Sequence, residues 1–197
     1  MKLTNENSPD WFDLTYLQKG TPRQQKAYQA IQLSKVFSHL KPYSPVLAGT
    51  IPLGIDTETS DLDILYCTNN LNALSKQVYS LYQHYDEFSI RHQSIREQQV
   101  VVTNFYFSGF EFEIFAQNTA SHSQHAYRHM VQEYRLLRLF GNPLRELVYQ
   151  LKRQGVKTEP AFAQCLQLKG DPYLALLEME KIPNKEIMNT YKELLKQ

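Results

Sequence analysis

Two aspartates, Asp61 and Asp63, lie two residues apart in a stretch that is otherwise apolar around them. Alternate side chains of a β-strand share a face, so both carboxylates are predicted to point the same way, opposite to Leu62 and Ile64. Two carboxylates that close repel each other unless a cation lies between them, and hard oxygen ligands suit Mg²⁺ or Mn²⁺. The pair therefore predicts a site for a divalent metal ion.

A glycine-containing turn, Gly49-Thr50-Ile51-Pro52-Leu53-Gly54, precedes the two aspartates. The backbone N–H groups of such a turn and the hydroxyl of Thr50 are donors that suit a phosphate group. Phosphate binding next to a divalent metal site indicates nucleotide chemistry.

The combined pattern resembles a known signature. Gly-[Ser/Thr]-x-x-x-Gly followed by Ser-Asp-h-Asp-h, where h is apolar, is similar to the signature of the DNA polymerase β-like nucleotidyltransferase superfamily, over about residues 40–116. Residues 126–130 and 157–163 resemble a small bacterial subfamily of unknown function. The resemblance implies an α+β fold, with a mixed sheet and flanking helices over 1–120 and a helical subdomain over 121–197.

The superfamily resemblance also implies a third carboxylate on a strand beside the Asp-x-Asp strand. Residues 110–115 alternate apolar and acidic side chains, which places Glu111 and Glu113 on one face. The family form, an acid followed by two apolar residues, favours Glu113, and Glu111 remains the alternative. An antiparallel strand with one solvated face would show the same alternation without any catalytic role.

The resemblance implies a reaction in which a nucleoside monophosphate moves from an NTP to a hydroxyl acceptor and pyrophosphate is released. In such reactions two metal ions hold the attacking and leaving oxygens. Asp61, Asp63 and Glu113 are the expected catalytic residues and ligands of Mg²⁺ or Mn²⁺, and Glu113 is also the candidate general base. The expected nucleotide-binding residues are Gly49, Thr50, Ser60 and Arg128.

The net charge of +1 gives no electrostatic basis for a dedicated nucleic-acid binder. A small molecule or a protein side chain is therefore the expected acceptor, rather than a polynucleotide. Small transferases of the superfamily often carry Arg or Lys in the turn, where this chain has Ile51, Pro52 and Leu53. A cation from elsewhere must compensate, and the candidates are Arg91, Arg128, Lys152 and Arg153.

Two alternatives to an active transferase remain open, and the apolar turn favours only the first of them. One is a catalytically inactive nucleotide-binding or regulatory protein of the same fold. The other is an interaction module whose helical part forms a homodimer. His122, His125 and His129 add a third question, because imidazoles at this helical spacing can chelate zinc. Since no fourth ligand is evident, two other interpretations are preferred: Arg128 or His129 lines the cleft opposite the sheet, or the histidines cap and pack the helix.

The rest of the sequence is consistent with a folded enzyme of 197 residues, with 42% apolar and 21% charged residues. Two distant cysteines, an N-terminus without an apolar segment and the absence of an apolar run of about 18 residues predict a cytoplasmic protein without a membrane partner. Periodicity and turn residues predict helices over 21–40 and 70–85, strands over 45–48, 62–67, 87–92, 99–107 and 110–116, and helices from 123 onward.

Overall fold

The computed structural model describes residues 8–195, which divide into two units. The first unit contains 8–54 and 61–124, and the second contains 55–60 and 125–195. The N-terminal heptapeptide, on which part of the prediction of a cytoplasmic protein rests, lies outside the described residues. Within the described range, no helix is both long and apolar enough to span a membrane.

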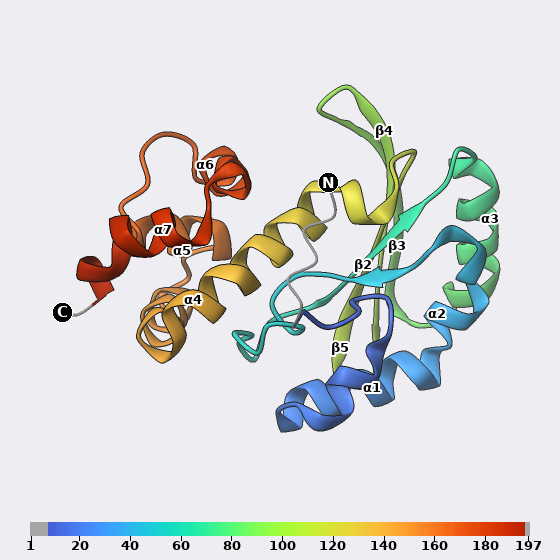
Figure 1. The fold of residues 1–197 in the computed structure, drawn as a ribbon. Coiled ribbons are helices and arrows are strands. Elements are labelled where there is room, and N and C mark those ends of the chain that lie inside the picture. Colours follow the sequence, from blue (N-terminus) through green and yellow to red (C-terminus); the bar gives the residue numbers. More distant parts are fainter. Residues whose placement is uncertain (1–7, 196–197) are drawn as a thin grey trace. The chain divides into compact units, whose positions relative to one another are not determined.

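The first unit is built from a sheet and short helices, which confirms the α+β class (Figure 1). Its elements, in chain order, are η1 (Leu14–Lys19), α1 (Pro22–Ser34), α2 (Val36–His39), η2 (Lys41–Tyr43), β1 (Val46–Leu47), β2 (Leu62–Cys67), α3 (Leu71–Tyr82), β3 (Asp86–Ile95), β4 (Gln98–Phe107), β5 (Phe110–Gln117) and η3 (Ser121–Ser123). The predicted strands are all present, and their bounds differ from the predictions by a few residues at most.

The described strands form one five-stranded sheet in the order β1-β2-β5-β4-β3. Strands β2 and β5 are parallel, and the other neighbours are antiparallel. The predicted turn between β4 and β5 is confirmed: Ser108 and Gly109 have φ angles of 51° and 84°, and two consecutive positive φ values suit the twist of a tight hairpin. The parallel pair requires a long crossover connection, which α3, β3 and β4 provide.

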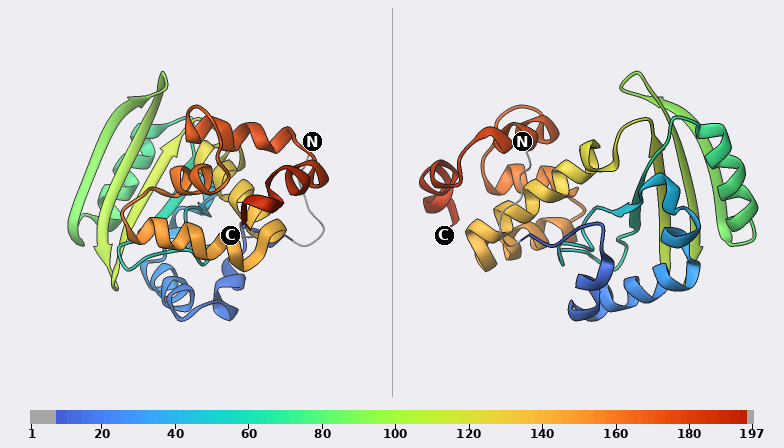
Figure 2. Two further views of the ribbon diagram at one scale, coloured as in Figure 1. Left: turned by 90° about the vertical axis from the view of Figure 1, so that its left-hand side faces the viewer. Right: turned by 45° about the vertical axis from the view of Figure 1, so that its right-hand side comes forward.

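One face of the sheet packs into the hydrophobic core with helices α1, α2 and α3. Figure 2 (right) shows α3 running along this face of the sheet. Leu62 and Ile64 from β2, with Phe112 and Ile114 from β5, are fully buried there. Phe105 lies between Tyr82 and Phe112 in a stack, with ring centroids 5.1 and 4.8 Å apart. Because side chains alternate along each strand, the polar residues of β2 and β5 project from the opposite face.

The predicted helix over residues 21–40 is present but interrupted at a single residue. Helix α1 ends at Ser34, Lys35 takes a left-handed conformation with φ of 57°, and α2 starts again at Val36. The break turns Val36 fully into the core and lets its carbonyl accept a hydrogen bond of 3.1 Å from the buried Tyr66 hydroxyl. This tertiary partner overrides the helical pattern of the local sequence.

The N-terminus of α1 fastens the turn that follows β1. Thr21 and Gln24 form a capping box, in which each side chain accepts a hydrogen bond from the other residue's backbone N–H. The amide nitrogen of the same Gln24 side chain donates to the carbonyls of Ile51 and Pro52, at 2.8 and 3.2 Å. One buried side chain therefore satisfies both a helix end and the turn.

The second unit is helical, as the sequence predicts. Its elements are α4 (His125–Arg153), α5 (Thr158–Cys165), α6 (Pro172–Glu178), η4 (Met179–Lys181), α7 (Asn184–Tyr191) and η5 (Lys192–Leu195). The predicted break near residue 141 is confirmed, because Gly141 has a non-helical backbone (φ 63°, ψ −145°) within α4. Arg135 of α4 donates to the side chain of Asn184 and to the carbonyl of Met179, which ties α4 to η4 and to the first residue of α7.

The double role of Gln24 generates a stability prediction. Gln24→Ala should lower the free energy of unfolding by about 1–3 kcal/mol, because it removes the Gln24 half of the capping box and both side-chain hydrogen bonds to the turn. The carbonyl of Pro52 loses this donor, whereas that of Ile51 keeps the N–H of Gly54. The matched control is Gln25→Ala, since Gln25 is exposed and its side-chain amide donates to the carbonyl of Gly20. Urea unfolding of both variants checks the difference, and equal losses would contradict the role assigned to Gln24.

Candidate functional site

The predicted phosphate turn lies directly against the Asp-x-Asp strand. Gly49 has a φ of 74°, and a Cβ atom at this position would overlap the carboxylate of Asp63. The backbone is held in place by the N–H of Ala48, which donates to the carbonyl of Asp63 at 2.8 Å. Gly49 is therefore required for two reasons, its left-handed backbone and the close approach of an acidic side chain.

The apolar residues of the turn have a structural explanation. Ile51, Pro52 and Leu53 are all buried, whereas the preceding Gly49 and Thr50 are half-exposed. The backbone folds into two successive turns, with Leu53 N–H donating to the carbonyl of Thr50 and Gly54 N–H to that of Ile51, both at 3.1 Å. These positions belong to the core, so a charged side chain there would be costly to bury.

The carboxylates of neighbouring strands are aligned by the parallel pairing of β2 and β5. Asp63 lies opposite Glu113 in the register, and adjacent strands are about 4.8 Å apart. Both side chains are half-buried. Asp61 directly precedes β2, and Glu111 is exposed and lies opposite Tyr106 of β4. The register thus places Glu113, rather than Glu111, next to Asp63.

An amide bridges the two glutamates. Asn104 of β4 lies opposite Glu113, and its Nδ2 donates to Glu111 Oε1 at 2.9 Å and to Glu113 Oε2 at 3.4 Å. Its Oδ1 accepts a 2.7 Å hydrogen bond from Nη2 of Arg91 on β3. Polar side chains therefore run across four strands on one face of the sheet. We call Asp63, Glu113, Asn104 and Arg91 the polar row.

The electrostatics of the row favour a cation. Burial raises the pKa of Glu113 above its ordinary value, and the negative charges of Asp61 and Glu111 raise it further. The hydrogen bond from Asn104 and the positive charge of Arg91 lower that pKa but only in part. Bringing a divalent cation to these oxygens would stabilise the ionised form of Glu113, because the opposite charge offsets both the desolvation and the repulsion.

Within residues 8–195, no group of three or more His, Cys, Asp or Glu side chains is drawn together closely enough to hold a metal ion. The donor types still fit Mg²⁺ or Mn²⁺, since carboxylates at adjacent strand positions can rotate towards a shared ion. Asp61, Asp63 and Glu113 are the residues that would hold it. The backbone register aligns these residues, and rotation about their side-chain torsions would bring the carboxylates to the shared ion.

The other two predicted nucleotide-binding residues belong to the second unit. Ser60 closes a short turn, in which its hydroxyl accepts a 2.9 Å hydrogen bond from the N–H of Thr57. The guanidinium of Arg128 forms a two-pronged ion pair with Glu180, at 3.1 and 2.7 Å. A phosphate would have to share Arg128 with this carboxylate.

The three histidines predicted on one face do not form a cluster of equivalent ligands. His122 lies in η3 of the first unit, whereas His125 and His129 are on α4 of the second. The ring of His129 is buried, with Nε2 2.9 Å from the carbonyl of Tyr173 and Nδ1 3.4 Å from Glu159. His129 therefore connects α4 to α5 and α6, as the packing interpretation expects.

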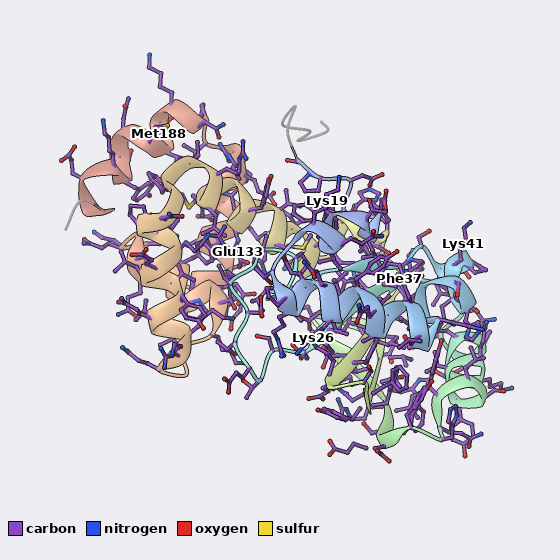
Figure 3. The ribbon with its side chains drawn as sticks, turned by 90° about the horizontal axis from the view of Figure 1, so that it is seen from below. Lys19, Lys26, Phe37, Lys41, Glu133 and Met188 are labelled. Carbon is purple, nitrogen blue, oxygen red and sulfur yellow. The ribbon has the colours of Figure 1, made fainter. Side chains whose placement is uncertain are left out.

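Glu133, a buried acid, lies one turn of α4 after His129. Glu133 (Figure 3) is 3% exposed, and its Oε1 has no hydrogen-bond partner among the described residues. Burial raises its pKa well above the ordinary value, the charge of Glu159 raises it further, and Lys152 lowers it. For Glu159, burial raises the pKa, but the hydrogen bond and charge of His129 lead to a net lowering.

The conformation of Gly49 leads to a paired mutational test. Gly49→Ala and Gly109→Ala both force alanine into a left-handed backbone, which costs about 1–2 kcal/mol at each site. Only Gly49→Ala also pushes a methyl group against Asp63, whereas nothing lies within 4 Å of a Cβ at Gly109. Chemical unfolding should show a larger loss for Gly49→Ala, and NMR shifts should change at Asp63 in that variant alone.

The raised pKa of Glu113 predicts a pH dependence of stability in the absence of metal. Because this pKa is higher in the folded than in the unfolded chain, the unfolding free energy should fall as pH rises from the ordinary glutamate pKa through the raised one. Glu113→Gln should remove this part of the slope, and the exposed Glu111→Gln should leave more of it. Urea unfolding at several pH values measures the slopes. A Glu113→Gln slope equal to that of the wild type would refute the assignment.

The chain is similar to three solved structures, which show the fold that it shares with them. One is of Cid1, described as having RNA terminal uridylyl transferase activity; its TM-score is 0.53 at 11% identity, covering 78% of this chain and 51% of Cid1. Another is of Cid1 poly(U) polymerase with Mg and 3′-dATP bound (TM-score 0.52, 12% identity, 83% and 52% coverage). The third is a GLD-2/RNP-8 complex (TM-score 0.50, 17% identity, 93% and 71% coverage).

These similarities show a nucleotidyltransferase-like fold, and the chain spans about half the length of the Cid1 chains that it matches. No curated protein matches the chain by sequence. A family model described as "Domain of unknown function (DUF4269)" matches residues 29–179, which is more than half of the chain and includes both the polar row and most of the second unit. The chain therefore belongs to the DUF4269 family.

Proposed function

We propose that this protein is a metal-dependent nucleotidyltransferase that moves a nucleoside monophosphate from an NTP to a hydroxyl acceptor. The observation that carries the proposal is the position of Asp63. Its carboxylate contacts the Gly49 turn on one side, and its strand places it beside Glu113 on the other. A phosphate-binding turn and an acidic pair are thus combined within one sheet, as the chemistry requires.

Each residue has a definite task in this proposal. The backbone of Gly49 and the hydroxyl of Thr50 bind the triphosphate, with Ser60 and Arg128 as further candidates from the second unit. Asp61, Asp63 and Glu113 would hold Mg²⁺ or Mn²⁺, which supplies charge neutralisation at the transferring phosphate. Glu113 is also the candidate to accept the proton of the acceptor hydroxyl, because its carboxylate is kept ionised when a divalent cation is bound.

The net charge of the chain and the comparisons point to different classes of acceptor. The structural neighbours include an RNA terminal uridylyl transferase and a poly(U) polymerase. This chain has a net charge of only +1, which provides little attraction for a polynucleotide. We therefore favour a small-molecule or protein hydroxyl, and an RNA oligonucleotide belongs in any acceptor screen as the competing class.

A catalytically inactive nucleotide-binding protein is the second candidate. The burial of Ile51, Pro52 and Leu53 favours it, because these positions supply no cation to a triphosphate. Nucleotide binding would then persist without turnover. Only the active transferase forms a product, whereas both candidates bind nucleotide in a metal-dependent manner.

Ligand-dependent melting tests the binding step that both candidates share. ATP, GTP, CTP or UTP with Mg²⁺ or Mn²⁺ should raise the Tm of the wild type, because ligand that binds only the folded state stabilises it. At about 100 times the Kd, the gain is about 2.7 kcal/mol. Asp63→Asn should lose the rise, since it removes a metal-binding charge, and EDTA should abolish it in the wild type.

The choice between the glutamates is tested by the same melts. Glu113→Gln should reduce the metal-dependent rise strongly and Glu111→Gln only weakly, because only Glu113 lies opposite Asp63 in the register. The reverse order would assign the third ligand to Glu111. If no nucleotide shifts the Tm of folded wild type at millimolar concentration, the transferase proposal is rejected.

A further inference from the structure

Arg91, the positively charged member of the polar row, donates its hydrogen bonds to uncharged side chains. Arg91 is exposed on β3, and its guanidinium donates to Asn104 Oδ1 at 2.7 Å and to Ser89 Oγ at 3.4 Å. Both partners are uncharged, in contrast to Arg128, whose guanidinium is paired with Glu180. Arg91 therefore has a fixed position and keeps its positive charge available to a ligand.

The order of strands gives Arg91 a particular place relative to the reaction proposed above, on which this inference rests. The phosphate turn lies between β1 and β2, Asp63 is on β2 and Glu113 is on β5. Next come Asn104 on β4 and Arg91 on β3, at the opposite edge of the sheet. If the triphosphate occupies the turn and the acceptor hydroxyl lies at Glu113, the remainder of the acceptor extends towards Arg91.

The hydrogen bonds of Asn104 hold this geometry. Because Arg91 donates to the amide oxygen, the amide nitrogen must face the two glutamates, to which it donates. Arg91 is thereby kept at a set distance from Glu113 without forming an ion pair with it. Adjacent strands are about 4.8 Å apart, and β3 lies two strands from β5. Because the Arg91 side chain reaches over β4 to Asn104, its guanidinium lies about 5–10 Å from the carboxylate of Glu113.

We propose that Arg91 binds an anionic group of the acceptor, and that the acceptor carries a hydroxyl and a phosphate or carboxylate about 5–10 Å apart. A planar guanidinium binds either anion through paired N–H groups. This assigns the acceptor to the small hydroxylated phosphate esters and acids. It also gives Arg91 a role different from that of a triphosphate-binding cation.

An NMR titration tests the assignment without relying on turnover. The Nε–Hε signal of Arg91 is identified by its absence in Arg91→Gln, and ¹⁵N-labelled protein is titrated with glycerol 3-phosphate, 5-hydroxypentanoate and glycerol. One or both anions should shift the Arg91 signal in a saturable manner, and neutral glycerol should not. The ligand that binds more tightly distinguishes a phosphate from a carboxylate acceptor.

Matched variants separate a specific site from general attraction to positive charge. Arg91→Gln should weaken binding of the preferred anion by about tenfold or more, because charge-assisted hydrogen bonds are lost. Arg91→Lys keeps the charge but not the paired N–H groups, so its loss should be smaller. Arg96→Gln, in the exposed turn between β3 and β4, should leave the affinity unchanged.

Several results would overturn the inference. These are no shift of the Arg91 signal with either anion, an equal shift with glycerol, or an equal loss of affinity in Arg96→Gln. If Arg91→Gln lowers the affinity for the Mg²⁺–nucleotide complex, Arg91 binds the triphosphate and not the acceptor. That result would also overturn the inference. Nucleotide binding without anion binding at Arg91 rejects this inference alone, whereas anion binding at Arg91 without nucleotide binding supports the anion site and rejects the transferase.

Discussion

The parallel pairing of β2 and β5 is the constraint on which the rest of the first unit depends. It places Asp63 opposite Glu113, and a shift of one residue would turn every side chain of the strand to the other face. The apolar face resists such a shift, because Ile64 and Ile114 are fully buried in the core. The packing of buried core residues thus aligns the carboxylates on the opposite face of the sheet.

The two faces of the sheet have separate tasks. The stack of Tyr82, Phe105 and Phe112 fills one side with rigid aromatic rings, which favours one arrangement of β4 and β5. The other side can then carry closely spaced acids whose mutual repulsion costs stability. Gly49 adds a further restriction, since its missing side chain is what allows the carboxylate of Asp63 to lie against the turn.

Local signals predicted the strands and the alternation of the acids, because both depend on period-two patterns and turn residues within one segment. The break at Lys35 was not predicted, since it depends on a hydrogen bond to Val36 from Tyr66, distant in sequence. Asn104 was also missed. An asparagine within the apolar strand 99–107 was the available signal, because Asn is depleted in strands, but its partners depend on the register.

The charge balance of the site explains why a divalent ion is a better partner for this face than an internal cation. Burial and the negative charges of Asp61 and Glu111 raise the pKa of Glu113, and the guanidinium of Arg91 offsets this rise only in part. An exposed guanidinium is also screened by water and salt. A divalent ion bound directly to the carboxylate oxygens would act at shorter range and with twice the charge. Because Asn104 accepts the hydrogen bond of Arg91, we infer that this guanidinium serves the anionic group of the proposed acceptor rather than the acids.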